Sequence, residues 1–327
     1  MGWWALWGLF SLKVLTLCVL VSGFLLFVIG AASKAKQRMK AGQLVIKNLS
    51  ETFHEQNQDL WEQILDKKQL KQKKRALKQA KKQRAQAAPL PTLYILTFEG
   101  DLQASGADHL AKEVSAIIEV AAPHDEVLIK IDSPGGVVHG YGYAASQLVR
   151  LKDKGLKLTV AVDKVAASGG YLMAVVADQL LAAPFAIIGS IGVVAQIPNF
   201  NRLLKQKGVD FEQITAGEYK RTLSLFGENT EAGREKMQTQ LESIHEQFKQ
   251  FIRRQRPQVD IEEIATGDHW LGEEAKRLYL VDELKTSDAY ILEAFEAGRA
   301  LFQVQYEQKK SLGRRFHLAL ANTFKFR

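Results

Sequence analysis

The chain of 327 residues is poor in cysteine, with Cys18 alone in an apolar N-terminal stretch. A single cysteine excludes a disulfide framework within the chain, and the rest of the sequence has no thiol for a metal site or for catalysis. Residues 14–32 lack charge, and residues 66–86 lack both glycine and proline. The first absence is typical of a membrane span, and the second of a helix or a solvated linker.

The net charge of +8 belongs to one segment of the chain. Residues 33–90 hold 15 Lys and Arg against 5 Asp and Glu, whereas residues 91–327 hold 28 against 31. A nucleic-acid-binding domain carries its positive charge on the fold itself. The distribution therefore argues against nucleic acid as a partner.

Residues 1–32 are predicted to form an N-terminal membrane anchor. The uncharged run is long enough to span a bilayer, and the tryptophans before it suit a membrane interface. A cleaved signal peptide ending near Ala32 is the alternative, although its apolar core would be unusually long. The positive-inside rule places the following basic flank in the cytoplasm. This flank consists of Lys34, Lys36, Arg38 and Lys40.

Three further segments follow the anchor. Residues 33–90 are predicted to be a basic linker, in which the Lys- and Gln-rich part 66–86 is either helical or disordered. Residues 91–300 carry the pattern of a folded domain, and residues 301–327 form a basic tail.

The pattern of the folded domain alternates between strands and helices. Apolar runs predict strands at 93–98, 126–131 and 156–162, with shorter ones at 180–183 and 187–194. Helical spacing predicts helices at 107–120, 140–152 and 231–254, and another after residue 168. This alternation is typical of an α/β fold with a mainly parallel sheet.

Ser168 lies where a small apolar run meets Gly169 and Gly170 and a helix begins. Free backbone N–H groups and the helix dipole favour negative charge at such a turn. The position suits a nucleophile beside an oxyanion site. An ordinary helix N-cap is the alternative.

A second Gly-Gly turn, Asp132-Ser-Pro-Gly-Gly136, follows the second strand. Proline fixes one backbone angle, while glycines at 135 and 136 allow conformations that other residues avoid. The two Gly-Gly turns after neighbouring strands are therefore candidates to donate two N–H groups to one oxyanion.

A serine nucleophile needs a base, for which histidine and lysine are the candidates. Among the seven histidines only His139, just after the second Gly-Gly turn, has a suitable position, and contact with substrate suits it better than catalysis. Lys220 follows a glycine and a tyrosine, but spacing alone does not distinguish it from an exposed loop lysine. Ser190, inside Gly189-Ser-Ile-Gly-Val193, either orients a buried amine or forms a turn.

Four motifs in this order resemble the signal peptide peptidase A family, and most closely its SohB-type branch of membrane-anchored serine peptidases. They are Asp132-Ser-Pro-Gly-Gly136, Ala167-Ser-Gly-Gly-Tyr171, Gly189-Ser-Ile-Gly-Val193 and Gly217-Glu-Tyr-Lys220. The resemblance spans about residues 92–300. The long Lys- and Gln-rich insertion is not part of the family's core pattern.

The resemblance implies a fold like that of Clp protease and crotonase, built from repeated strand–strand–helix units. It implies a Ser–Lys dyad with Ser168 as nucleophile, Lys220 as general base and Ser190 positioning the amine. Gly169 and either Gly135 or Gly136 would donate to the oxyanion. No metal or organic cofactor is implied.

The resemblance also implies partners and a location. The substrates would be peptides, proteins or membrane-protein and signal-peptide remnants. The subunits would form a ring or dome-shaped homo-oligomer, with the dyad sometimes shared between neighbours. The chain would reside in the bacterial inner membrane through its N-terminal helix. The family favours the periplasmic side for the catalytic domain, whereas the basic flank favours the cytoplasmic side.

Two other functions are compatible with the same residues. One is a crotonase-like acyl-CoA enzyme, which also uses paired N–H donors on an oxyanion. The other is a catalytically silent scaffold that keeps the fold and binds partners. Ser168 and Lys220 argue against both.

Overall fold

The computed structural model describes residues 42–86, 90–217 and 219–307. The chain divides into two compact units, and the unit Ile46–Gln305 contains nearly all of the described sheets and helices. The predicted anchor, residues 1–32, lies outside the described residues. Within the described ranges no helix combines the length and the apolar character that crossing a bilayer requires.

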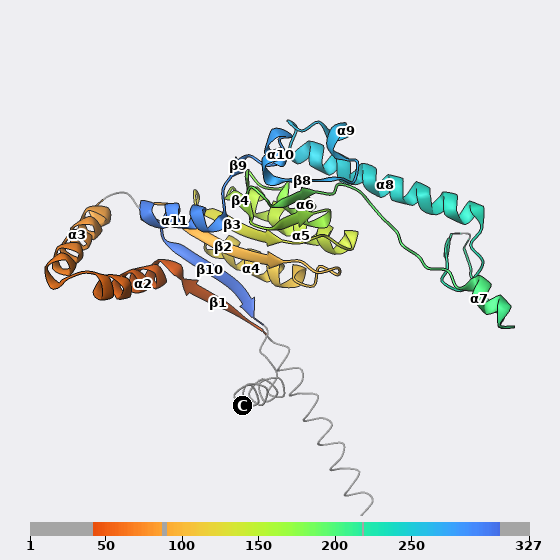
Figure 1. Ribbon diagram of the computed structural model, residues 1–327, viewed down its shortest axis with the longest axis horizontal. Helices are drawn as coiled ribbons and strands as arrows, with labels where there is room; N and C mark the ends of the chain where they lie inside the picture. Colours follow the sequence, from red (N-terminus) through yellow and green to blue (C-terminus); the bar gives the residue numbers. More distant parts are fainter. Residues whose placement is uncertain (1–41, 87–89, 218, 308–327) are drawn as a thin grey trace, which may run out of the picture. The chain divides into compact units, whose positions relative to one another are not determined.

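A seven-stranded sheet forms the centre of the fold (Figure 1). From β10 to β9 every neighbouring pair in it is parallel. Its central strands are almost continuously apolar because both faces are covered. The strand order is β1 (Gln43–Asn48), β10 (Leu301–Glu307), β2 (Leu93–Glu99), β3 (Glu126–Asp132), β4 (Lys157–Val162), β6 (Gln179–Ala182) and β9 (Glu283–Leu284).

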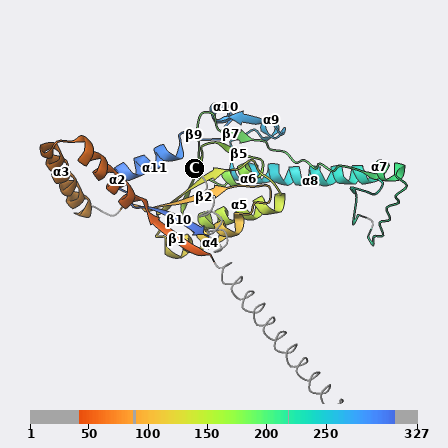
Figure 2. The same ribbon diagram turned by 60° about the horizontal axis from the view of Figure 1, so that its bottom comes forward.

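Two apolar clusters cover the two faces of this sheet. The larger joins the sheet to α4 (Ala107–Val120), α5 (Val138–Asp153) and α6 (Gly169–Ala174), which Figures 1 and 2 show near β2 and β3. The smaller joins alternate strand residues to α11 (Ser287–Ala297). The side-chain period of two along each strand therefore divides the core into two layers.

A small second sheet positions the turns that the sequence singled out. It consists of β5 (Val165–Ala167), β7 (Ile187–Gly189) and β8 (His269–Leu271). An isolated parallel bridge joins Ser133, just past β3, to Ala166 in β5. The residues that follow Ser133 and Ala166 are thereby brought together.

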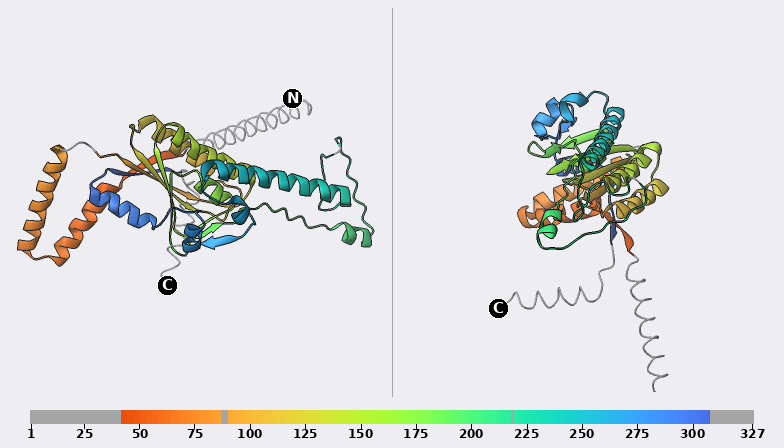
Figure 3. Two further views of the ribbon diagram at one scale, coloured as in Figure 1. Left: turned by 90° about the horizontal axis from the view of Figure 1, so that it is seen from above. Right: turned by 90° about the vertical axis from the view of Figure 1, so that its right-hand side faces the viewer.

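The long helix α8 (Glu231–Gln255) runs beside α5 and α6 (Figure 3). Thr230 caps its N-terminus by accepting a hydrogen bond from the Gly233 amide, and Ile252 is buried in the core. Phe248 and Phe251 pack against the larger cluster. The remaining helices are α2 (Leu49–Ile64), α3 (Lys67–Gln86), α7 (Asn201–Gln206), α9 (Ile261–Ile264) and α10 (Gly272–Arg277).

The mainly parallel α/β sheet and its three central strands confirm the sequence prediction, as do the helices at 107–120, 140–152 and 231–254. The strand predicted at 187–194 is too long, since β7 ends at Gly189, which adopts φ +105°. Hydrophobic character alone did not reveal that a left-handed glycine ends the strand.

The segments on either side of the folded domain contain more structure than the sequence predicts. Residues 49–64 of the predicted linker form α2, whose Phe53 ring lies 5.2 Å from that of Phe295 in α11. The Lys- and Gln-rich part is helical, as α3. Residues 301–307 of the predicted tail form β10, where Leu301 and Val304 are buried. Long-range packing, which local composition does not encode, orders α2 and β10.

Candidate active site

Ser168 adopts a backbone conformation that is unusual for a residue with a side chain. It lies between β5 and α6 with φ 50° and ψ −118°. Positive φ is sterically costly for a non-glycine residue, and such strain is concentrated at functional sites. The Ser168 amide donates to the carbonyl oxygen of Gly189 at 2.7 Å, and the Ser168 carbonyl accepts from the Leu172 amide at 2.9 Å. These two bonds hold the strained residue in place.

The hydroxyl of Ser168 makes no capping hydrogen bond, although the residue occupies the N-cap position of α6. The interpretation as an ordinary N-cap is therefore wrong. The side chain is half-buried and lines a large cavity. In α/β-hydrolases the nucleophilic serine is exposed on a strained strand-to-helix turn of this kind.

The two Gly-Gly turns lie against each other. The Ser133 amide donates to Val165 and the Ala167 amide donates to Ser133, at 2.9 and 3.0 Å. Gly135 has φ +91°, and a Cβ there would lie 2.8 Å from both the Gly169 nitrogen and the Ser168 Cβ. The backbone of the second turn thus reaches Ser168 itself only because residue 135 is glycine.

Hydrogen bonds behind the site distinguish the two glycines. The amide of Gly135 donates to Ser133 Oγ at 3.1 Å, in a buried contact. That amide is therefore engaged within the turn. Gly136 also lines the cavity, which leaves its amide as the better partner for Gly169 in an oxyanion site.

A cavity of about 1380 Å³ opens in front of Ser168. Its floor contains the two Gly-Gly turns and Ser190, and one wall is a face of α8 that carries Leu241, Ile244, Phe248 and Phe251. Such dimensions exceed those of a typical small-molecule pocket. The size of the cavity and the apolar side chains of its α8 wall suit a peptide in extended conformation.

Ser190 shares the strained geometry of Ser168. Its φ is 51°, it is half-buried, and its amide donates to the Asp268 carbonyl at 2.7 Å. The preceding Gly189 packs so closely on Trp270 that a Cβ would come within 2.7 Å of the ring. The loop is thus fixed with Ser190 lining the same cavity as Ser168.

Lys220 and His139 do not lie in this cavity. Lys220 is exposed in the segment between α7 and α8, where its amide donates to the Gly217 carbonyl at 3.1 Å. His139 is exposed in the first turn of α5. Of the predicted site residues, the chain brings together Ser168, Gly169, Gly135, Gly136 and Ser190.

His245 is a cavity residue that sequence reasoning missed. Its half-buried ring lies on α8 and lines the cavity, whereas the sequence pointed only to His139 among the histidines. Its Nε2 lies 3.2 Å from the Ile191 carbonyl, next to Ser190. Position 245 follows Leu241 by four residues and precedes Phe248 by three, so the helical period already placed it on the apolar face.

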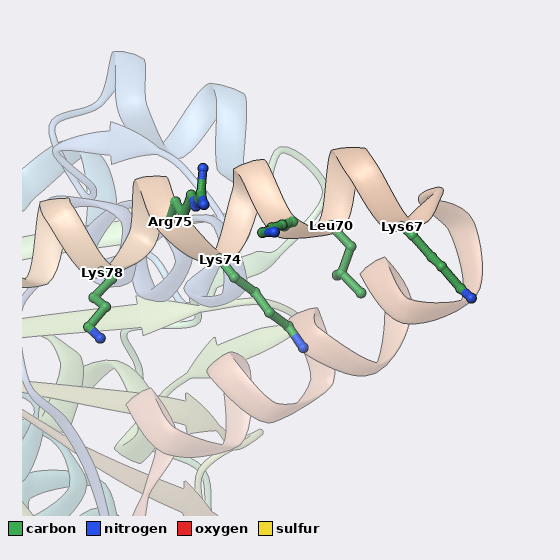
Figure 4. Close-up of a pocket in the computed structure, with 6 residues that line it drawn as sticks. Lys67, Leu70, Lys74, Arg75 and Lys78 are labelled. Carbon is green, nitrogen blue, oxygen red and sulfur yellow. The ribbon is translucent and has the colours of Figure 1, made fainter.

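A second, open groove of about 350 Å³ runs along α3 (Figure 4). It is lined by Lys67, Leu70, Lys71, Lys74, Arg75 and Lys78. Lys74 pairs with Glu62 of α2 at 3.0 Å. The six lining residues include no serine, threonine, cysteine or acidic residue. Among the described residues no group of three His, Cys, Asp or Glu side chains is placed to hold a metal ion.

Comparison with known proteins identifies relatives along almost the whole chain. Two family models match it, "Peptidase family S49" over residues 150–300 and "Peptidase family S49 N-terminal" over residues 4–148. "Probable protease SohB" of Haemophilus influenzae is 50% identical over 325 residues, covering 95% of this chain and 91% of that protein.

Two further relatives cover smaller parts. "Probable protease SohB" of Buchnera aphidicola subsp. Acyrthosiphon pisum is 53% identical over 224 residues, which are 68% of this chain and 66% of that protein. "Protease 4" of Haemophilus influenzae is 29% identical over 197 residues, which are 58% of this chain and 31% of that protein.

Proposed function

The chain belongs to peptidase family S49 and is a SohB-type peptidase, and we propose that it is a serine endopeptidase whose nucleophile is Ser168. The observation that carries this proposal is the strained, uncapped Ser168 on the floor of a large cavity, in contact with Gly135. Ser190 also lines the cavity with positive φ. Among the described residues that line the cavity, however, Ser168 is the serine that lies between the two Gly-Gly turns.

In the proposed reaction Ser168 Oγ attacks the carbonyl carbon of the scissile peptide bond, and the hydroxyl proton passes to a neutral lysine amine. The amides of Gly169 and Gly136 stabilise the negative oxygen of the tetrahedral intermediate. The C–N bond then breaks, the departing amine takes the proton from lysine, and an acyl-enzyme remains. Water hydrolyses that ester by the same steps and restores the Ser168 hydroxyl.

Lys220 is the proposed general base, and it acts on Ser168 of a neighbouring copy of the chain. Support comes from its exposure and its absence from the residues that line the cavity of its own chain. The segment that carries it also exposes apolar side chains that suit contact with another subunit. These include Val209, Phe211, Ile214, Leu225 and Phe226. Ser190 would orient the incoming amine.

The proposal extends to fold, location and substrates. The parallel sheet is consistent with the Clp protease and crotonase fold and its repeated units. Residues 1–32 would anchor a ring or dome-shaped homo-oligomer in the bacterial inner membrane. The substrates would be peptides or membrane-protein remnants that enter the cavity in extended conformation. His139, exposed on α5, would contact substrate outside the cavity.

Acylation tests the nucleophile directly. A fluorophosphonate probe incubated with the full chain is expected to modify Ser168, identified by mass spectrometry of the digested protein. Ser168→Ala should abolish both labelling and hydrolysis of an unfolded protein substrate. Labelling of a different serine, or hydrolysis that survives in Ser168→Ala, would disprove the assignment. A crotonase-like enzyme would have no serine that the probe acylates.

A further inference from the structure

Two buried hydroxyl groups lie directly behind the proposed oxyanion site. Ser133 and Tyr141 are both 0% exposed. Ser133 Oγ lies 2.6 Å from the Tyr141 hydroxyl, which in turn lies 2.8 Å from the carbonyl oxygen of Asp101. With the Gly135 amide they form an unbroken series of hydrogen bonds from the turn to the residues after β2.

The direction of each hydrogen bond in this series follows from the number of protons. The Asp101 carbonyl only accepts, so the single proton of the Tyr141 hydroxyl is directed to it. Ser133 must therefore donate to Tyr141, and its oxygen is free to accept from the Gly135 amide. Burial raises the pKa of Tyr141, which keeps the phenol protonated at working pH. Every member of the series is thus satisfied in one arrangement.

Tyr141 also contacts the first Gly-Gly turn. A Cβ on Gly169 would lie 2.4 Å from Cγ of the Tyr141 ring. On the other side, a Cβ on Gly100 would lie 2.1 Å from Ser133 Oγ and 2.5 Å from the Tyr141 hydroxyl. The backbone of Gly100 and that of Gly169 therefore pack closely against the pair. One side chain therefore touches both turns, through its ring and through its hydroxyl.

We propose that Tyr141 and Ser133 are positioning residues that set the spacing of the two oxyanion donors. The inference rests on the proposed serine peptidase function and assigns neither residue any contact with substrate. Ser133 engages the Gly135 amide, which orients the turn so that Gly136 faces the cavity. Tyr141 holds that turn at a fixed distance from Gly169. The site is thereby formed before substrate binds, which is the requirement for electrostatic stabilisation of a transition state.

The test is Tyr141→Phe in the full chain, which keeps the ring against Gly169 and removes only the hydroxyl. We expect kcat for a peptide substrate to fall about 10-fold to 100-fold, with KM changed less than about 2-fold, because a displaced donor weakens the transition state selectively. Tyr143→Phe is the matched control, since Tyr143 lies on the same helix, is 45% exposed and does not line the cavity. It should match the wild type.

Two inhibitors separate positioning from general loosening of the structure. A peptide boronic acid forms a tetrahedral adduct whose oxygen occupies the oxyanion site, whereas the cleaved product peptide binds without one. Tyr141→Phe should weaken the boronate by the same factor as kcat and leave product binding unchanged. Equal weakening of both inhibitors, or an unchanged kcat, would overturn the proposal while the peptidase assignment stands. Failure of the wild type to be acylated would overturn both.

Ser133→Ala provides a second route should Tyr141→Phe not fold, because it leaves the Tyr141 bond to Asp101 intact. The same selective loss of boronate affinity is expected. In the double variant Ser133→Ala/Tyr141→Phe the loss of kcat should be no larger than in the worse single variant, since both changes interrupt one series of bonds. Additive losses would show that the residues act separately and would contradict the proposal.

Discussion

Gly135 and Ser168 are so close that a methyl group on Gly135 would lie 2.8 Å from the Ser168 Cβ. The two residues belong to different turns, 33 positions apart in the sequence, and the bridge between Ser133 and Ala166 brings them together. Neither side of the contact has a flexible side chain that could rotate away. The position of the proposed nucleophile is therefore coupled to the conformation of the other turn.

Gly135→Ala should abolish most peptidase activity, by at least about 100-fold in kcat, because the added methyl displaces the turn that is proposed to donate to the oxyanion. The positive φ adds about 1–2 kcal/mol of strain. Gly155→Ala is the matched control, since Gly155 has φ +84° and nothing within 4 Å of the position of a Cβ. It should lose stability by the same backbone strain and keep its activity. Steady-state hydrolysis and urea unfolding measure the two effects.

A dyad shared between subunits predicts complementation between inactive variants. Ser168→Ala and Lys220→Ala should each be inactive alone. Co-expressed, they should recover about a quarter of wild-type activity, because random mixing in a ring places an intact serine against an intact lysine at that fraction of interfaces. A mixture that stays inactive, or activity in Lys220→Ala alone, would contradict the shared dyad.

Glu126 links β3 to the C-terminal elements of the sheet. Its carboxylate accepts from Arg299 at 2.6 Å, from Thr159 at 2.7 Å and from Tyr290. Burial alone would raise the pKa of Glu126, but these hydrogen bonds together lower it. Its stabilising effect is therefore complete above the ordinary glutamate pKa and is lost as the pH falls through the lowered value.

Glu126→Gln should reduce the free energy of unfolding at pH 7 by about 3 kcal/mol, because Arg299 would lose its buried counter-ion. The difference from the wild type should shrink as the pH falls below the ordinary glutamate pKa of about 4.3 and through the lowered pKa of Glu126. Glu119→Gln, an exposed position on α4, should show little change at any pH. Urea titrations between about pH 3 and 8 measure this, and a difference that grows on acidification would refute it.

Arg256 fixes the C-terminal end of α8 to the core. It is 3% exposed, forms a two-bond pair with Asp282 at 2.6 and 3.1 Å, and donates to the Tyr279 carbonyl. Lysine cannot reproduce this planar set of donors. Arg256→Lys should lower stability by about 2 kcal/mol and raise KM, because α8 forms a wall of the cavity. Arg253→Lys is the control, because the Arg253 side chain is 44% exposed and its ion pairs lie at the surface. It should change neither the stability nor KM.

The central strands and helices could be predicted from local sequence because each carries its own period. Leu93 to Phe98 is apolar almost throughout, and Leu241, Ile244, Phe248 and Phe251 repeat at helical spacing. The helix α2 and strand β10 were missed, since their order depends on partners far away in the chain. Local composition is a weak guide where long-range packing decides.

Part of the candidate site could also be predicted from local sequence. Ser168, Gly135 and Gly136 lie in short turns whose glycines reveal the conformation. The series from Gly135 to Asp101 was not predictable, because it joins residues 8 and 40 positions apart through side chains that look ordinary in the sequence. The proposed base Lys220 was indicated by its motif Gly217-Glu-Tyr-Lys220 and not by periodicity, because an exposed loop lysine has no periodic pattern.

The place of β10 in the sheet has a consequence for biosynthesis. This strand, near the C-terminal end of the described chain, lies between β1 and β2, which are translated long before it. Until residue 301 has left the ribosome, the edge of β2 lacks its neighbour and Glu126 lacks Arg299. The sheet is therefore completed only after β10 has been made. A peptidase assembled in this order exposes a hydrophobic edge during translation and gains its full stability only after the two Gly-Gly turns of the proposed site have already been made.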